Sequence, residues 1–266
     1  MDAFSKLPDE LNALVESFKS HAAWGNLQVG VTQYSFYMYI ACILLLVLVF
    51  RFCAKQKGQL VPKGRFVNAM EYGVEFVRDS ILSDSLGDTW RKHFPFLATV
   101  FFFVLINNML GLIPGMHPGT GCIGTTAAVA LMSFVYFIVV GCRKRGVWGY
   151  IKSLAPKGVA FPINILVWLI EVFSTFLRLI TLAVRLFCNM YAGHIVMGTF
   201  AILASLFFEP LLQQVTAQAL AGSLASVAWI AVLIIIYLVE MLVAFIQAYV
   251  FTLLSTVYVQ LAEQDD

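Results

Sequence analysis

The sequence is poor in charged side chains, and neither sign of charge is in large excess. Only 12% of its 266 residues are charged, and 17 Lys and Arg against 15 Asp and Glu leave a formal net charge of +2. Such a small surplus argues against nucleic acid as a partner. Because 61% of the residues are hydrophobic, the chain is too apolar for a soluble domain of this size. The composition predicts a polytopic membrane protein.

Several motifs of catalytic and secreted proteins are also missing. The five cysteines show no CxxC or zinc-ligand spacing, so we expect neither a metal site nor a disulfide framework. No GxxxxGK[ST] loop is present, which predicts that this chain has no nucleotide site, and nothing indicates a cofactor. The first 30 residues are acidic and lack an apolar core region, so they resemble neither a secretory signal nor a transit peptide.

Long uncharged runs predict the membrane segments. A hydrocarbon core needs about 20 residues per crossing helix, and four regions free of Asp, Glu, Lys and Arg are long enough to cross or deeply enter it. The run from 94 to 142 is divided by the turn-forming stretch IPGMHPGTGCIG. We predict a single all-α membrane domain over 1–266: an outer tail at 1–33, transmembrane helices at 34–52, 94–115 and 123–142, and two long tilted membrane helices at 160–207 and 222–262.

Basic residues set the predicted orientation. They cluster between the first two spans and again after the third, so both loops are expected on the inner side of the membrane. Within the first loop, apolar residues recur at steps of three and four, which predicts an amphipathic helix over 63–86 on the inner surface. His93 and His117 fall at loop ends, where we expect them to be solvated.

A ladder of polar residues marks the two long helices. Glu171, Arg178 and Arg185 are spaced seven apart, which keeps them near one stripe of a helix. Glu240 and Gln247 repeat that spacing on the last helix. If the two helices form an antiparallel hairpin, Arg185 lies level with Gln247, and His194 lies roughly level with Glu240.

Most of these residues also have a plain structural interpretation. Arg178 can extend to the inner interface, Glu171 can pair with a loop lysine, and Asn189 can join helices by hydrogen bonds. Interior packing would equally account for His194. The amides of Asn107 and Asn108 fit either packing or the wall of a wet cavity. Arg185 differs, because a charge at mid-bilayer costs at least about 2.5 to 3.5 kcal/mol and is a functional candidate by default.

Four quoted stretches carry a family resemblance: LAVRLFCNMYAGH, EMLVAFIQAYVFTLLSTVYVQLA, NAMEYGVEFVRDSI and NNMLGLIPG. Together they resemble subunit a of the rotary F-type ATP synthase over nearly the whole chain after the tail. The resemblance implies a membrane stator with two long helices against the ring of c subunits. It further implies two offset half-channels, proton transport coupled to ATP synthesis, and partners that include the c-ring, the subunit b peripheral stalk, the rest of the complex and the lipid bilayer.

The resemblance also implies roles for individual residues. Arg185 matches the arginine that faces the buried carboxylate of a c subunit, with Gln247 and Asn189 close by. His194 and Glu240 match the lining of the outer half-channel, and Glu171 that of the inner one. Here the acid and the imidazole of the outer pair are exchanged relative to many bacterial members, an arrangement that keeps both groups in one cavity. The secondary candidates are Arg178, Asn107, Asn108 and Thr181.

The sequence leaves two other functional classes and a choice of compartment open. The alternative to the stator is a stand-alone secondary transporter or ion channel, but the sequence shows no convincing internal repeat. An intramembrane enzyme would need facing catalytic groups, and only His194 and Glu240 resemble such a pair. Protons are the default ion over sodium. A bacterial plasma membrane is the expected location, with the mitochondrial inner membrane as the alternative.

Overall fold

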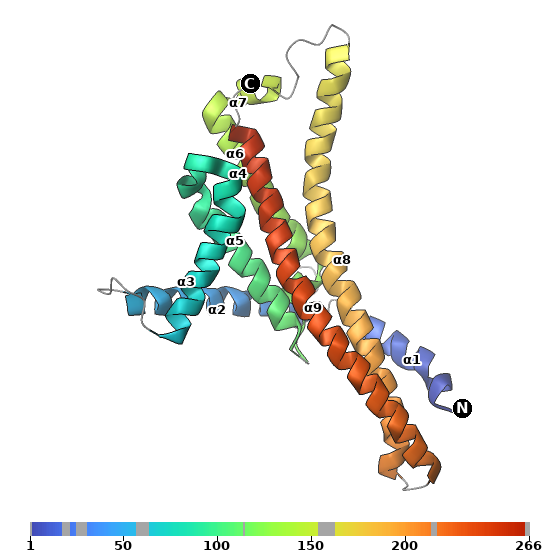
Figure 1. Cartoon of the computed structure of the whole chain (residues 1–266). Helices are drawn as coiled ribbons and strands as arrows, with labels where there is room; N and C mark the ends of the chain where they lie inside the picture. The colour runs from blue at the N-terminus through green and yellow to red at the C-terminus, as the bar shows by residue number, and fades with distance from the viewer. Residues whose placement is uncertain are drawn as a thin grey trace.

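Helices make up nearly all of the chain that the structure describes. The computed structural model describes residues 2–17, 22–24, 31–56, 64–113, 115–153, 163–213 and 217–263. Five helices in these segments are long and apolar enough to cross a membrane, so the fold is the all-α multi-pass membrane fold that the composition predicts (Figure 1). The strands in the described part, β1 (Ala22–Trp24) and β2 (Val31–Thr32), form one short antiparallel pair.

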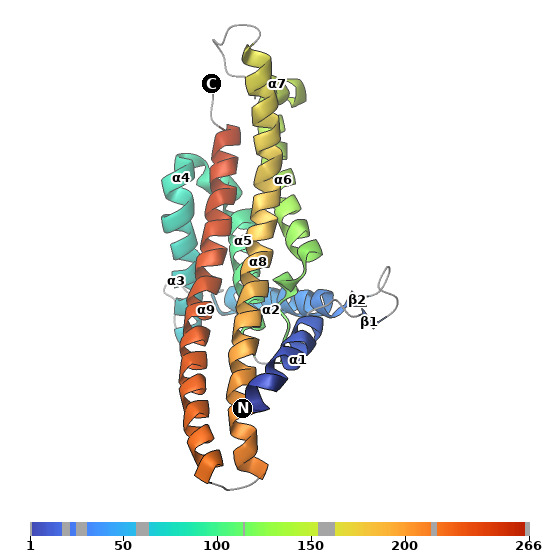
Figure 2. The ribbon, with the colours of Figure 1, turned by 90° about the vertical axis from the view of Figure 1, so that its right-hand side faces the viewer.

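The N-terminal part consists of two helices with different surroundings. Helix α1 (Asp2–Ser17) lies in the segment for which the sequence predicted only an outer tail, and the side chain of Leu14 fills the space beside Gly198 of α8. Helix α2 (Gln33–Gln56) runs crosswise to the longest helices (Figures 1 and 2). Its 24 residues correspond to about 36 Å, which is enough to cross a hydrocarbon core of about 30 Å.

The amphipathic segment is a helix with a wide turn in it. Helix α3 (Arg65–Val77) continues into a π-helical turn, η1 (Arg78–Ser83), then into α4 (Asp84–Leu86) and a 3-10 turn, η2 (Gly87–Thr89). The sequence predicted a single helix over 63–86. The wide turn allows two consecutive residues, Ile81 and Leu82, to be completely buried, which a regular helix on a flat surface does not favour.

The next two helices form a hairpin in the core of the protein. Helix α5 (Trp90–Gly111) is joined through a 3-10 turn, η3 (Gly119–Gly121), to α6 (Ile123–Arg145), and a short α7 (Val147–Ser153) follows. The prediction of 94–115 for the first of these was displaced by about one turn. The helix ends at Gly111 because the backbone folds back there, and Gly115 adopts a φ of 85°, which a right-handed helix cannot contain.

Two very long helices complete the fold. Helices α8 (Ile163–Gln213) and α9 (Ala217–Glu263) have 51 and 47 residues and lie side by side (Figures 1 and 2). At 1.5 Å per residue they extend about 76 and 70 Å, more than twice the thickness of a hydrocarbon core. They therefore cannot stand along the membrane normal, and their apolar lengths require a steep tilt.

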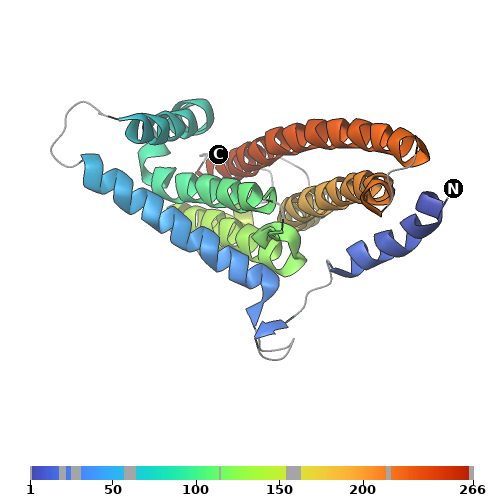
Figure 3. The same ribbon diagram turned by 90° about the horizontal axis from the view of Figure 1, so that it is seen from below.

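The core lies where α5 and α6 meet the long hairpin. Leu97, Phe101 and Val104 of α5 are buried with Leu186 of α8 and Phe251 of α9. Viewed from below, α5 and α6 lie between α2 and the hairpin (Figure 3). This core fixes one face of α8 and α9 and leaves their other faces exposed.

Candidate functional site

Contacts at three levels define the register of the α8–α9 hairpin. The guanidinium of Arg178 lies 5.4 Å from the ring centroid of Tyr258. The carboxyl group of Glu240 lies directly against the backbone of Gly193. Farther along, the hydroxyl of Ser226 donates to the carbonyl oxygen of Ala204 at 2.8 Å. The two helices are therefore antiparallel along most of their length.

This register fixes the level of the central residues. Arg185 lies eight residues before Gly193, and Gln247 lies seven residues after Glu240, so both fall at the same level of the hairpin. His194 follows Gly193 and lies at the level of Glu240. The relative levels that the spacing predicts are confirmed.

Arg185 lies on an open, apolar face of α8. The residue is exposed, and its exposed neighbours on that helix include Leu177, Ile180 and Val184. Within the segments that the structure describes, its guanidinium forms no ion pair or hydrogen bond. Thr181 is also exposed, and its hydroxyl donates to the carbonyl oxygen of Arg178 at 3.1 Å. A permanent cation thus stands on a surface where the described part of this chain offers it no acidic partner.

Two amide side chains near this level have unsatisfied donors. Gln247 is buried, with 7% of its surface exposed, and its Nε2 has no hydrogen-bond acceptor in the described part of the chain. The same is true of Nδ2 of Asn189 on α8. A buried amide without a partner costs about 1 to 3 kcal/mol, so both groups have hydrogen bonds to offer to a group outside this chain.

His194 is held on both sides by main-chain carbonyl groups. Its Nδ1 lies 2.8 Å from the carbonyl oxygen of Met190, and its Nε2 lies 2.8 Å from that of Gly111 at the end of α5. A carbonyl oxygen only accepts hydrogen bonds, whereas a neutral imidazole has one N–H. A neutral ring therefore donates to one of the two carbonyl oxygens, and a protonated ring donates to both.

Glu240 approaches the same region from α9. Its carboxyl atoms would lie 2.4 to 2.7 Å from a Cβ atom built on Gly193, so the approach requires a glycine there. In the described structure the carboxylate makes no hydrogen bond or ion pair. The acid is therefore placed beside His194 without being fixed by a direct partner.

Arg185 and His194 point to different surroundings. The guanidinium is on the exposed face of α8, whereas the imidazole is directed toward α5. Nine residues of an ideal helix correspond to a rotation of about 180°, so this difference is expected from their spacing. A proton path that reaches both residues has to pass around α8.

The inner part of the ladder is an ion pair. Arg178 Nη2 lies 2.9 Å from Glu171 Oε1, and the two side chains are 26% and 39% exposed. The predicted loop lysine is not the partner of Glu171 in the described structure, since Arg178 is. The packing of Arg178 over Tyr258 holds this pair against α9.

Asn107 and Asn108 are completely buried in α5. Asn107 Nδ2 donates to the carbonyl oxygen of Phe103 at 2.9 Å. Asn108 donates to the carbonyl oxygen of Ala244 at 3.5 Å and accepts from the hydroxyl of Thr120 at 3.1 Å. The Asn108 contacts join α5 to α9 and to the turn before α6, which favours the packing interpretation for this residue. The Asn107 bond stays within α5, and its buried Oδ1 has no hydrogen-bond partner in the described part of the chain.

Comparison with known proteins identifies the family. The sequence model described as "ATP synthase A chain" matches residues 35–260. The chain is 38% identical to ATP synthase subunit a of Myxococcus xanthus, covering 88% of this chain and 73% of that protein. It is also 38% identical to the subunit of Rhodopseudomonas palustris strain BisA53, covering 88% and 89%. The chain belongs to the ATP synthase subunit a family.

Membership in this family makes the chain part of a proton-transporting ATP synthase complex in a membrane. A third relative, subunit a of Hyphomonas neptunium, is 36% identical over 88% of this chain and 87% of its own length. The matched residues 35–260 contain all the candidate site residues named above. They also contain most of the crosswise helix α2 and most of the long hairpin.

Sequence reasoning missed several residues that the structure brings into contact with the candidates. Gly193 and Gly111 act through their backbones, and only the close approach of helices reveals them. The prediction that His93 is solvated is wrong, because the residue is 4% exposed and bonded to Tyr136 and Glu263. No sequence signal links these three residues, since they come from α5, α6 and α9.

His117 was also expected to be solvated, and it is half-buried. Its ring lies edge-on to Tyr34 and Tyr37, with centroids 5.8 and 6.2 Å away. Burial lowers the pKa of His117 below its ordinary value, and the charge of nearby His194 lowers it further. The turn that carries His117 therefore belongs to the packed outer end of the protein.

Proposed function

We propose that this subunit is a proton-conducting stator in which Arg185 faces a buried carboxylate of the c-ring. The observation that supports this most directly is an exposed arginine on an apolar helix face, without an acidic partner in the described part of its own chain. A cation in such a position costs at least about 2.5 to 3.5 kcal/mol unless water or another protein solvates it. A rotor carboxylate satisfies that requirement when it is ionised.

The arginine controls where the carboxylate can lose its proton. A protonated carboxyl group is neutral and tolerates lipid, whereas the ionised group needs a partner in low dielectric. Arg185 stays charged under working conditions and stabilises the ionised form beside it. Its fixed charge also opposes a continuous file of protons across the subunit. Protons must then travel on the ring.

The remaining candidates form two offset half-channels. His194 and Glu240 load protons from the outer side, because an imidazole and a carboxyl group at one level can exchange a proton. Glu171 receives protons on the inner side, where its ion pair with Arg178 holds it. Asn189 and Gln247 offer their unsatisfied donors to the ionised carboxylate beside Arg185.

The same proposal covers the partners and the location. The c-ring contacts the exposed faces of α8 and α9, and the subunit b peripheral stalk holds the subunit against rotation. ATP is made on other chains of the complex, and no nucleotide site is expected on this one. All three relatives named above are bacterial proteins, which supports a bacterial plasma membrane over a mitochondrial inner membrane. Family membership also favours the complex over a stand-alone transporter.

The decisive experiment replaces Arg185 by alanine in the complete complex reconstituted into vesicles. We expect ATP-driven proton pumping to be lost, accompanied by a passive proton leak through the joined half-channels. Arg51→Ala is a matched control, because it removes an exposed arginine at the end of α2 and should leave pumping unchanged. Coupled pumping by Arg185→Ala at the native rate would reject the proposed role.

A further inference from the structure

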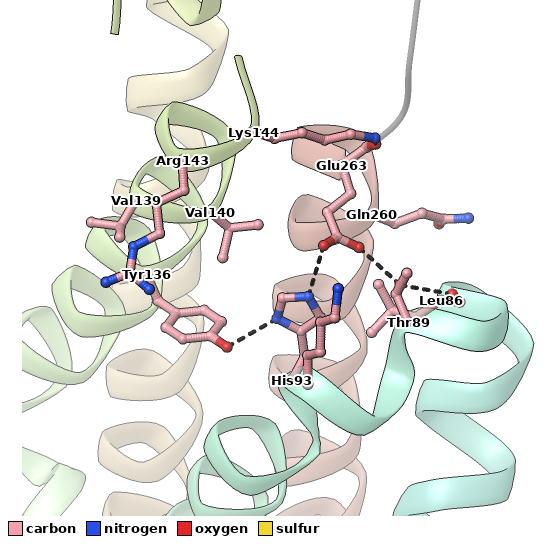
Figure 4. Close-up of a pocket in the computed structure, with 11 residues that line it drawn as sticks. Leu86, Thr89, His93, Tyr136, Val139, Val140, Arg143, Lys144, Gln260 and Glu263 are labelled. Carbon is pink, nitrogen blue, oxygen red and sulfur yellow. Dashed lines mark hydrogen bonds and ion pairs between the residues drawn. The ribbon is translucent and has the colours of Figure 1, made fainter. Parts of the chain in front are cut away.

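A cavity lies where three of the membrane helices end. It has a volume of about 630 Å³ and is enclosed by η2, the start of α5 and the ends of α6 and α9 (Figure 4). Helix α5 begins at Trp90, α6 ends at Arg145 and α9 ends at Glu263. Tryptophan and clustered basic residues are typical of the interface between hydrocarbon and water. The cavity therefore lies at the level of the lipid headgroups on the basic, inner side.

The acidic group in the described wall of the cavity is already bound by its neighbours. Glu263 Oε1 lies 3.0 Å from Nε2 of His93, and its Oε2 accepts a hydrogen bond from Thr89 at 2.8 Å. On the other side of the imidazole, His93 Nδ1 lies 2.9 Å from the hydroxyl of Tyr136. The dashed lines in Figure 4 join these four side chains. Both carboxylate oxygens are thus occupied within the wall.

Two cations in the wall do not bind the carboxylate of Glu263. Lys92 of α5 and Arg143 of α6 form no ion pair or hydrogen bond within the described segments. Lys144, next to Arg143, donates to the main-chain carbonyl oxygen of Glu263. Lysine and arginine on separate helices that flank one cavity can bind the oxygens of a single phosphate group from two sides.

The rest of the wall indicates where that phosphate comes from. Leu86, Val139 and Val140 are also part of the lining. Apolar contacts do not stabilise a bound phosphate ion. In a phospholipid, the glycerol joins the phosphate to acyl chains, whose methylene groups can contact an apolar wall. Basic pockets between membrane helices at the inner surface suit anionic headgroups, which the potential of that surface also concentrates.

We propose that this cavity is a binding site for the phosphate headgroup of an anionic phospholipid of the inner leaflet. Lys92 and Arg143 bind the phosphate oxygens, while Val139 and Val140 contact the first part of the acyl chains. The bound lipid contacts the ends of α5, α6 and α9 together, because all three helices contribute to the lining. The residues that line this site do not include Arg185 or His194, so the proposal does not depend on the roles proposed for those two residues.

The test measures lipid binding by the complete complex after removal of its lipids in detergent. Phosphatidylglycerol is titrated into the native complex and into the double variant Lys92→Gln/Arg143→Gln, and bound lipid is measured by native mass spectrometry. We expect binding at this site to weaken about 30-fold, the effect of removing two basic side chains at a membrane surface. The matched control, Arg51→Gln/Arg91→Gln, removes two exposed arginines that do not line the cavity and should bind as the native complex does.

Two further arms identify the source of the phosphate. Phosphatidylcholine carries the same phosphate with no net charge and should bind at least tenfold more weakly than phosphatidylglycerol. Millimolar inorganic phosphate should neither displace the bound lipid nor raise the unfolding temperature. Equal lipid binding by the double variant and its control would overturn the proposal. Complete displacement by inorganic phosphate would overturn the lipid assignment in favour of a soluble anion.

Discussion

Two histidine and glutamate pairs lie at opposite ends of the core, and they are built differently. In the pair called inner here, after its predicted side of the membrane, His93 and Glu263 bond directly to each other, with Thr89 on the carboxylate and Tyr136 on the imidazole. In the pair called outer for the same reason, the imidazole of His194 is held by the carbonyl oxygens of Met190 and Gly111. Glu240 lies against Gly193 with no hydrogen bond in the described structure.

This difference separates a structural pair from a pair suited to proton exchange. The side chains of His93 and Glu263 bond to each other and to Tyr136 and Thr89, so the loss of either breaks contacts between three helix ends. Glu240 makes no such contact, so its carboxyl group can change partners at small structural cost. The same two residue types therefore serve packing at one end and, as we propose, translocation at the other.

The largest expected effect comes from removing the outer acid while keeping its shape. Glu240→Gln should reduce ATP-driven proton pumping of the reconstituted complex at least tenfold, since an amide cannot exchange a proton. Glu263→Gln is the matched variant at the C-terminal end of α9 and should keep most of the pumping rate. Equal losses in the two variants, measured with a pH-sensitive dye in vesicles, would remove the distinction between the pairs.

Displacing the outer acid should have the next largest effect. An added Cβ at Gly193 meets the carboxyl atoms of Glu240 at 2.4 to 2.7 Å, so Gly193→Ala forces the carboxyl group to move. Pumping should fall by about threefold to tenfold while the complex still assembles. Gly124→Ala serves as the control, because its nearest contact is 3.9 Å away. A native pumping rate in Gly193→Ala would show that the position of the carboxylate is unimportant.

Breaking the inner pair should affect stability rather than transport. His93→Ala leaves the buried side of Glu263 without its donor, at a cost of about 1 to 3 kcal/mol. We expect a lower unfolding temperature of the detergent-solubilised complex, and partial rescue by His93→Gln, which can still donate. If His93→Ala abolished pumping at native thermal stability, the inner pair would have to be counted as part of the proton path.

The smallest effect concerns pH near the outer pair. Burial first, and then the charge of His194, lower the pKa of His117 from its ordinary value of 6.5. The folded subunit therefore binds this proton less readily than the unfolded chain, and stability from neutral His117 is lost as the pH falls through 6.5 toward the lower folded pKa. His117→Asn should flatten the fall in unfolding temperature between pH 7.5 and 5.5. An identical pH profile in the variant would contradict this assignment.

Much of this architecture follows from the sequence because the bilayer imposes simple rules. Apolar length predicts the membrane helices, and the seven-residue spacing predicts the levels of Arg185 and Gln247. Spacing along a helix is local, so it survives folding unchanged. The same rule anticipates that Arg185 and His194 face opposite sides of α8.

Features that depend on contacts between distant segments could not be predicted in this way. The burial of His93 depends on Tyr136 and Glu263, which are 43 and 170 residues away in the chain. The wide turn η1 depends on the shape of the core against which Ile81 and Leu82 are buried, and not on the helix propensity of its own residues. Likewise, the role of Gly193 is visible only once α9 brings a carboxyl group beside it.

The length of α8 has a mechanical consequence. Glu171 and His194 are 23 residues apart on this helix, which corresponds to about 34 Å along its axis. Because α8 is steeply tilted, most of this distance lies parallel to the membrane plane rather than across the membrane. No side chain spans such a gap. If protons enter beside His194 and leave beside Glu171, as we propose, a separate carrier that moves past α8 has to transport them between the two residues.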